Sequence, residues 1–384
     1  MISVIVIGKN EGERLAACLR SIQTALNALA HEVVYVDSCS TDQSLQTAKA
    51  LGARCFLLAE RKTTAGLGRF VGAKEARGEY LLFLDGDMQL QPGFAEKALM
   101  AIAAKGYDGV CGIREDVYLR GGEIVGRNDN YFCCTQERLA PEFGGALMIT
   151  RDALDACGGW ATDTVACEEA ELYARLKATG CRIAEIPVPM ILHTDAVRDS
   201  RSPLSTVFSA RRLGEGQALA CAMKARRARA YIRHEREKFT FYALDWLALA
   251  LLALVPGFGL GLMMLLECMQ LGWLLAQKRP RAFVSQKLFF FGLPLGLMTY
   301  RERSRAYALL RRVYQCLCKA ARESFLGALF MRQSARKPRT DGAAVLDYAP
   351  TRKDSGGNVV DAPELNLTWS LLSGGSFNAS YSKE

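Results

Sequence analysis

Two carboxylates, Asp85 and Asp87, are separated by one glycine directly after the apolar run Tyr80 to Leu84. Such a run is typical of a buried strand, so both acids stand at the carboxyl end of a strand. Two carboxylates at this spacing can turn toward one hard divalent cation. A cation held by few protein oxygens keeps positions open for substrate phosphates. The alternative is structural, because Asp-Gly is also common in turns.

Other polar residues follow other predicted strands. Apolar runs alternate with helix-like segments: runs at 3 to 7, 32 to 36 and 54 to 58, and segments at 12 to 30 and 43 to 52. The alternation predicts an α/β fold with a Rossmann-like, mostly parallel sheet and flanking helices. Ligands of such sheets bind outside the carboxyl ends of the strands. Asn10, Asp37 and Asp85 are therefore expected to converge on one crevice.

Asp37 begins the stretch DSCSTDQS after its strand. A carboxylate there can accept hydrogen bonds from a nucleobase or ribose, although a structural turn is the alternative, and Asp42 is expected to cap the next helix. In GLGRFVGAKEARGEY (66 to 80), Arg69 and Lys74 are expected to face a diphosphate. No Gly-Lys-Ser/Thr follows, so this is not the P-loop pattern.

Four motifs, in this order and spacing, resemble those of family 2 glycosyltransferases with the GT-A fold. They are Asn10-Glu11, VDSCSTDQS, GRFVGAKEARGEYLLFLDGDM, and GGW (158 to 160) with CEEAELYARLKATG (167 to 180). The resemblance covers about residues 1 to 200. It implies a nucleotide-diphospho-sugar donor, a divalent metal (Mg²⁺ or Mn²⁺) at the D-x-D, and inversion at the anomeric carbon.

The resemblance also implies residue roles. Asn10 and Glu11 would lie on the donor side, Asp37 would contact the base, Asp85 the ribose or sugar, and Asp87 the metal and diphosphate.

Glu168-Glu169 stands where the family has its acidic pair before a helix. The family pair is more often Glu-Asp, which leaves either Glu168 or Glu169 as the acceptor of the proton from the attacking hydroxyl. A positioned carboxylate contributes ~10²- to 10⁴-fold to such a step. The alternative is a solvated first helix turn whose acids are stabilised by the helix dipole.

His193 ends a further predicted strand at 181 to 193. The family often places a histidine here, which implies a contact with the metal or diphosphate. Arg198 and Arg201 follow, and either could clamp the diphosphate after the donor binds. The Gln-x-x-Arg-Trp pattern of processive relatives is not found downstream, which predicts one sugar added per encounter.

Composition narrows the class of protein. The chain has 384 residues, of which 50% are hydrophobic, enough for one large α/β domain with additions and too many for a disordered or fibrous chain. The net charge of +9 includes a dense basic stretch from Arg211 to Lys238, which suggests an anionic surface as partner. The 13 cysteines are odd in number and irregularly spaced, which favours reduced thiols. The apolar N-terminal run is too short for a signal peptide and is expected to be the first strand of a cytosolic domain.

A long apolar segment begins at Trp246. No charged residue occurs from there to Leu266, and the apolar character continues after Glu267 to Ala276. Basic residues flank both sides, and PGFG interrupts the middle, so a helical hairpin or re-entrant segment at about 241 to 277 is expected. A single span and a pair of buried soluble helices are the alternatives. Residues of about 286 to 300 are expected to be interfacial, and 333 to 384 to be a disordered tail.

These observations predict a GT-A domain at 1 to 205, a basic and apolar helical membrane-associated region at 206 to 332, and the tail. The predicted protein is an inverting glycosyltransferase at the inner (cytoplasmic) membrane, with its catalytic domain facing the cytosol. Its expected partners are the donor and a membrane lipid or lipid-linked saccharide acceptor but no nucleic acid, and homo-oligomerisation is left open. A sugar nucleotidyltransferase is an alternative, but it should carry a Gly-rich basic loop where GKNEGE stands. A non-catalytic sugar-binding scaffold would tolerate loss of Asp87 and Glu169, and both are present.

Overall fold

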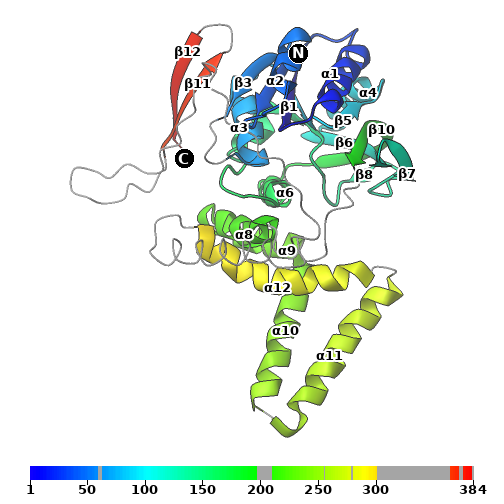
Figure 1. Ribbon diagram of the computed structural model, residues 1–384, viewed down its shortest axis with the longest axis vertical. Helices are drawn as coiled ribbons and strands as arrows, with labels where there is room; N and C mark the ends of the chain where they lie inside the picture. Colours follow the sequence, from blue (N-terminus) through cyan, green and yellow to red (C-terminus); the bar gives the residue numbers. More distant parts are fainter. Residues whose placement is uncertain are drawn as a thin grey trace, which may run out of the picture. The chain divides into compact units, whose positions relative to one another are not determined.

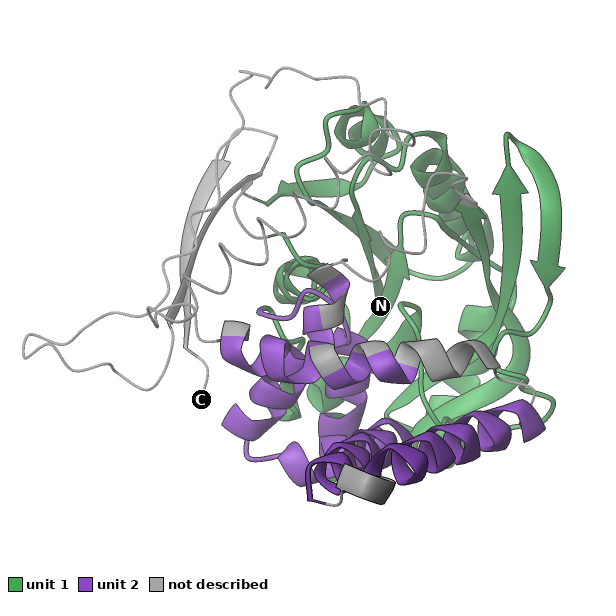
Figure 2. Cartoon of the chain, turned by 60° about the horizontal axis from the view of Figure 1, so that its bottom comes forward, with its two compact units in different colours: residues 1–162, 176–199, 334–384 green, residues 163–175, 200–333 purple. Residues whose placement is uncertain are grey.

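The computed structural model describes residues 1–58, 63–196, 210–254, 256–277, 280–300, 364–371 and 375–382 (Figure 1). The chain divides into two compact units, shown in Figure 2. Unit 1 comprises Met1–Thr162, Leu176–Asp199 and Ser334–Glu384, and unit 2 comprises Asp163–Arg175 and Ser200–Gln333.

The first half of unit 1 is a parallel sheet with the strand order β3-β2-β1-β4. Its strands are β1 (Ile2–Gly8), β2 (His31–Asp37), β3 (Arg54–Leu57) and β4 (Tyr80–Asp85). The helices between them are α1 (Glu13–Ala25), α2 (Ser44–Ala50) and α3 (Ala65–Glu75). These elements confirm the α/β class that the alternation predicted. The strand sequences are nearly continuously apolar because strands of such a sheet are buried on both faces.

Beyond β4 the sheet is mixed. β9 (Leu147–Thr150) pairs antiparallel with β4 and β6, and β6 then pairs parallel with β10. The other elements of this half are β5 (Met88–Leu90), α4 (Phe94–Lys105), β6 (Gly109–Arg120), β7 (Glu123–Asn128), β8 (Arg138–Leu139), α5 (Arg151–Ala156) and β10 (Ile183–Ala196). The predicted parallel arrangement therefore holds for the first four strands, and the later strands include antiparallel neighbours.

The glycines of α3 have a packing role, whereas the sequence predicted that their stretch approaches a diphosphate. A Cβ on Gly72 would collide with Ile5 of β1, and one on Gly68 would lie 3.1 Å from the Ile7 side chain. These glycines let α3 pack closely on the sheet, so they do not form a phosphate loop. Lys74 was predicted to face a diphosphate. Its side chain is exposed and its Nζ lies 3.5 Å from Asp155 Oδ1, so the diphosphate contact stays a prediction.

Unit 2 is helical and includes the start of α6 (Glu168–Ala178). Its other elements are η1 (Ala210–Leu213), α8 (Gly214–Lys224), α9 (Ala228–His234), α10 (Arg236–Leu254), α11 (Pro256–Ala276) and α12 (Pro280–Tyr300). Ala174 of α6 belongs to the same apolar cluster as Ala218 and Tyr231, and the Val165 N–H donates to Gln217 Oε1 at 3.0 Å. The expected boundary at residue 205 therefore misplaces residues 163–175, because packing between distant segments assigns them to the helical unit.

Helices α10 and α11 lie side by side as two arms of a hairpin (Figure 1). Pro256 begins α11, where its missing N–H costs no helical hydrogen bond. In the described part of the chain one helix, over Gly259–Ala276, is long and apolar enough to cross a membrane. Lys287 of α12 joins the hairpin through ion pairs with Asp245 of α10 and Glu267 of α11.

The segment predicted to be interfacial is part of α12. Phe289 and Leu293 are 4% and 3% exposed and belong to the apolar cluster of unit 2. A Cβ on Gly296 would lie 2.6 Å from the Cα of Gly216, so two glycines let α12 and α8 approach closely. The packing of α12 on α8 therefore buries Phe289 and Leu293, which lie in the segment whose apolar composition predicted contact with a membrane surface.

The C-terminal part contains a hairpin of β11 (Glu364–Leu371) and β12 (Gly375–Ser382), paired antiparallel. The prediction of a disordered tail is therefore wrong for these two stretches. The sequence ELNLTWSL alternates polar and apolar residues, which is the period of a strand. Residues 334–363 lie outside the described residues.

Candidate active site at the strand ends of unit 1

The sheet register brings the predicted acids to one edge. Gly8 of β1 lies opposite Asp37 of β2, and Ile7 lies opposite Asp85 of β4. The Gly86 N–H then donates to the Ile7 carbonyl at 2.8 Å, which fixes the turn that carries Asp87. Gly86 is required there because a Cβ would lie 2.9 Å from Glu11 Cγ.

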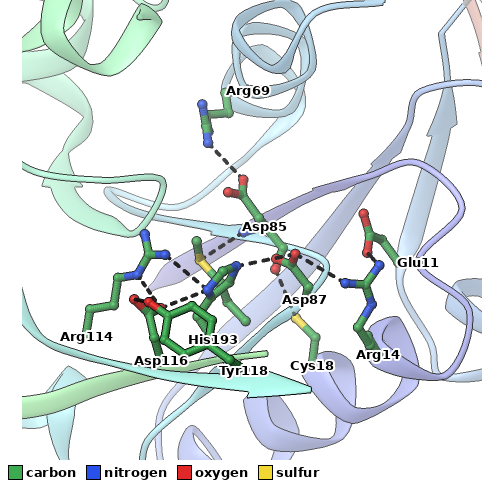
Figure 3. Close-up of polar contacts among 11 residues, drawn as sticks. Glu11, Arg14, Cys18, Arg69, Asp85, Asp87, Arg114, Asp116, Tyr118 and His193 are labelled. Carbon is green, nitrogen blue, oxygen red and sulfur yellow. Dashed lines mark hydrogen bonds and ion pairs between the residues drawn. The ribbon is translucent and has the colours of Figure 1, made fainter. Parts of the chain in front are cut away.

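Asp87 and His193 face each other at this edge (Figure 3). His193 Nε2 lies 3.5 Å from Asp87 Oδ2, and His193 Nδ1 lies 2.8 Å from Asp116 Oδ1. The register explains the meeting, since His193 of β10 is opposite Met88 of β5 on one side and Asp116 of β6 on the other. A protonated Nδ1 donates to Asp116 Oδ1, and Nε2 is directed to Asp87.

Opposite charges set the protonation of this pair. Burial opposes ionisation of Asp87, but the hydrogen bond and charge of His193, with Arg14, outweigh burial and lower the pKa of Asp87. Burial likewise disfavours the charged imidazole, but Asp87 and Asp116 outweigh it and raise the pKa of His193. Each member of the pair therefore favours the charged form of the other.

Glu11 completes the acidic group beside Asp87. Its carboxylate pairs with Arg14 at 2.7 Å, and Arg14 Nη1 also lies 3.7 Å from Asp87 Oδ2. Burial, and secondly the nearby charge of Asp87, raise the pKa of Glu11. Arg14 therefore offsets the repulsion between the two acids.

Arg69 lies behind Asp85 rather than on the open side. Its guanidinium is 4.8 Å from the centre of the Trp160 ring, and Nη2 donates to Asp85 Oδ1 at 2.8 Å. The Arg69 residue is 1% exposed, whereas the Asp85 side chain is 31% exposed. The structure therefore places Arg69 as an orienting partner of Asp85. The sequence predicted direct contact with a donor, and the burial of Arg69 does not favour it.

Gly145 closes the space around this ion pair and provides a matched test. A Cβ at Gly145 would collide with Asp85 Oδ2 and lie 2.8 Å from Arg69 Nη2. A Cβ at neighbouring Gly144 would meet only ordinary contacts, at 3.5 Å or more. We expect Gly145→Ala to lower the stability of the fold by about 1–3 kcal/mol through overpacking and to lower transfer activity, and Gly144→Ala to change neither. Thermal unfolding and turnover of both variants measure this, and equal behaviour of the two would contradict the tight packing behind Asp85.

Asp37 and Asn10 order the adjacent loop. Asp37 is fully buried, and its oxygens accept hydrogen bonds from Tyr35 OH at 2.9 Å and from the Ser40 N–H at 2.6 Å. Asn10 is exposed, and its Oδ1 accepts from the Thr41 N–H at 2.7 Å. These bonds assign both residues a loop-ordering role, and the predicted base contact of Asp37 stays a prediction.

The acidic pair Glu168 and Glu169 lies in unit 2, at the start of α6. Glu168 is buried at 5% exposure, whereas Glu169 is half-buried. The next acid, Glu171, is fully buried in an ion pair with Arg175, with 2.7 Å between Oε2 and Nη2. The predicted diphosphate clamps Arg198 and Arg201 lie outside the described residues.

The side chains of the site could supply some of the ligands of a metal ion. Among the described residues, no group of three or more His, Cys, Asp or Glu side chains is placed to hold a metal ion by itself. Asp87 and His193 supply a carboxylate oxygen and an imidazole nitrogen side by side, and Asp116 holds the far ring nitrogen, as is usual for a metal-bound histidine. The residues present therefore fit an ion whose remaining positions are filled by a diphosphate and water.

Four residues of the site were not predicted from the sequence. Arg114, Asp116 and Tyr118 alternate along β6, and Arg114 Nε donates to Asp116 Oδ1 at 2.8 Å. Polar residues at period 2 were a readable signal of one polar face of a strand. Arg14, three positions after Glu11 at a helix start, was a second readable signal.

Comparison with known proteins relates the N-terminal part of unit 1 to a known family. The family profile for Glycosyl transferase family 2 matches residues 3–162. A dolichol-phosphate mannosyltransferase of Pyrococcus furiosus is 34% identical over 156 residues, which are 40% of this chain and 41% of the relative. Glycosyltransferase AglE of Haloferax volcanii is 27% identical over 135 residues, 34% of this chain and 44% of the relative. The chain thus spans less than half the length of the curated relatives it matches.

A crystal structure of S. aureus TarS residues 1–349 in complex with UDP-GlcNAc aligns with 78% of this chain and 91% of that chain, at 18% identity and a TM-score of 0.48. This similarity is too low to transfer a ligand or a residue role. The mixed α/β sheet and the profile match agree with the predicted GT-A class. Residues 3–162 are therefore similar to glycosyl transferase family 2.

Proposed function

We propose that this protein is a metal-dependent, inverting glycosyltransferase that moves a sugar from a nucleotide-diphospho-sugar to a hydroxyl of a lipid-linked saccharide. The observation that carries the proposal is the pair of Asp87 and His193 at the strand ends of unit 1, with His193 Nδ1 held by Asp116. Residues 3–162 of this unit match the family 2 profile. Such a pair suits Mg²⁺ or Mn²⁺ together with a diphosphate.

The proposed chemistry is a single displacement at the anomeric carbon. The acceptor hydroxyl oxygen bonds to that carbon while the bond to the diphosphate oxygen breaks, and the diphosphate leaves with the electron pair. Glu169 takes the hydroxyl proton, a role supported by its being half-buried where Glu168 is buried. A divalent cation, when bound by Asp87 and His193, would neutralise charge that develops on the leaving diphosphate.

A lipid-linked acceptor at the cytosolic face of the inner membrane is the finer part of the proposal. It is supported by the apolar helix over Gly259–Ala276 and by the similarity to a relative named for a dolichol-phosphate substrate. An acceptor anchored in lipid would be presented at the level where such a protein binds the bilayer.

Asp116 is expected to act by positioning His193. We expect Asp116→Asn to raise the metal concentration for half-maximal activity by about 10- to 100-fold while turnover at saturating metal changes less. Titration of Mn²⁺ against activity, and against the thermal unfolding temperature, gives two readouts. A fall in turnover with unchanged metal dependence would assign Asp116 a different role.

Release of nucleotide diphosphate tests the proposed class. The purified full-length protein is incubated with a panel of nucleotide sugars, Mg²⁺ or Mn²⁺, and a membrane extract as acceptor source. We expect nucleoside diphosphate to form with one donor and labelled sugar to appear in the lipid fraction. Formation of pyrophosphate would indicate a nucleotidyltransferase instead, and no turnover with any donor, despite stabilisation by one of them, would indicate a sugar-binding protein.

A further inference from the structure

A groove of about 590 Å³ in unit 2 lies along α9 and the first half of α10. Arg229 and Arg233, four residues apart on α9, line it together with Arg236 at the start of α10. Phe239, Leu244 and Leu247 line it farther along α10. The groove therefore has a cationic part followed by an apolar part.

The three arginines carry charge that nearby acids do not neutralise. All three are exposed, and within the part of the chain that the structure describes none forms an ion pair. Lys238, two residues after Arg236, differs because its Nζ pairs with Glu215 at 2.7 Å and Glu235 at 2.9 Å. The local acids are thus already engaged, and the groove keeps its positive charge.

The apolar part of the groove continues into exposed apolar surface. Beyond Leu247, which is 48% exposed, α10 exposes Leu249 at 41% and Leu254 at 79%. The paired helix α11 exposes Met264 at 57% and Met269 at 61%. A soluble surface rarely leaves so many large apolar side chains together uncovered. From α9 into α10, guanidinium groups therefore come first and a hydrocarbon-like surface follows.

We propose that this groove binds an anionic phospholipid of the bilayer, with the phosphate on the three arginines and an acyl chain along Phe239, Leu244 and Leu247. Guanidinium groups bind phosphate oxygens in bidentate geometry, and this charged end precedes the apolar end, as in a phospholipid. A nucleic acid would match the arginines but not the apolar wall. This proposal rests on the membrane attachment proposed above, and it adds the class of lipid and the residues that bind it.

Vesicle binding of the full-length protein tests the site. We expect tighter binding to phosphatidylglycerol-containing vesicles than to pure phosphatidylcholine vesicles, and weaker binding as salt rises. Replacing the three arginines (R229Q, R233Q and R236Q together) is expected to weaken binding to anionic vesicles by about 100-fold, since each cation near an anionic surface contributes about fivefold. The preference over neutral vesicles should then disappear.

A matched control removes three exposed basic residues of unit 1 that form no ion pair among the described residues (R20Q, R77Q and K97Q together). This variant should bind the anionic vesicles nearly as the parent does. A second pair separates the apolar part: Leu247→Gln should weaken binding to both vesicle types, and Met100→Gln, also at an exposed apolar residue, should not. Equal losses for the two triple variants, or no preference for anionic vesicles in the parent, would overturn the proposal.

Two further measurements distinguish other ligands. Inorganic phosphate at millimolar concentration should not displace the protein from anionic vesicles, and displacement would assign the groove to a free anion. Tighter binding of a labelled RNA oligonucleotide than of vesicles, lost in the arginine variant, would assign it to nucleic acid. None of these measurements depends on sugar transfer, so this site and the proposed enzymatic function can fail separately.

Discussion

Asp87→Asn is expected to lower kcat by about 10²- to 10³-fold, the range seen when one group that stabilises transition-state charge is removed. The substitution keeps the shape of the side chain and removes its charge. It also removes the carboxylate 3.5 Å from His193 Nε2 and 3.7 Å from Arg14 Nη1. The apparent affinity for Mn²⁺ should fall together with kcat, because the proposed cation loses a ligand. Steady-state kinetics over a series of metal concentrations measure both effects.

Asp129→Asn is the control for Asp87→Asn, because Asp129 is exposed and forms no ion pair among the described residues. Its kinetics should match those of the parent. Asp87 is part-buried with long ion-pair distances, so Asp87→Asn should change the free energy of unfolding by about 1 kcal/mol or less. Turnover of Asp87→Asn at the parental rate, at every metal concentration, would remove the proposed role of the Asp-Gly-Asp turn.

Glu169→Gln is expected to lower kcat by ~10²- to 10⁴-fold, the contribution of a positioned general base. Donor binding should be nearly unchanged, because the amide retains the size of the acid and the donor contacts proposed here lie in unit 1. The stabilisation of the protein by saturating donor, measured as a shift in thermal unfolding, reports donor binding independently of turnover.

Glu168→Gln provides the comparison, because the two acids are adjacent but differ in burial. We expect this variant to retain kcat within about tenfold and to lose stability, since Glu168 is only 5% exposed. The reverse result, with turnover lost in Glu168→Gln and kept in Glu169→Gln, would make Glu168 the base. Retention of turnover in both would place the proton acceptor elsewhere.

The positions of the first four strands were predictable because their chemistry is local. A buried parallel strand must be apolar over its length, and a polar residue at its carboxyl end marks the binding edge of the sheet. The acids Asp37, Asp85 and Asp87 were found in this way, and the register then placed Gly8 opposite Asp37 and Ile7 opposite Asp85.

Partners distant in sequence were not predictable in the same way. Asp116 meets His193 because β10 inserts beside β6, and residues separated by 77 positions become neighbours only through that pairing. Arg69 was expected to reach a ligand, but the Trp160 ring and Asp85 bury its guanidinium. A one-dimensional pattern shows which groups can ionise, and it does not show which countercharge the fold supplies.

The sequence by itself determined the α/β class, the family domain, and the candidate acids, because apolar periodicity and strand-end residues are set by local backbone geometry. Only the tertiary structure decided that residues 163–175 group with the helical unit, that Phe289 and Leu293 are packed rather than interfacial, and that Arg229, Arg233 and Arg236 line one groove. The reason is that packing free energy depends on which surfaces meet, and the same apolar segment is stabilised equally well by another helix or by lipid.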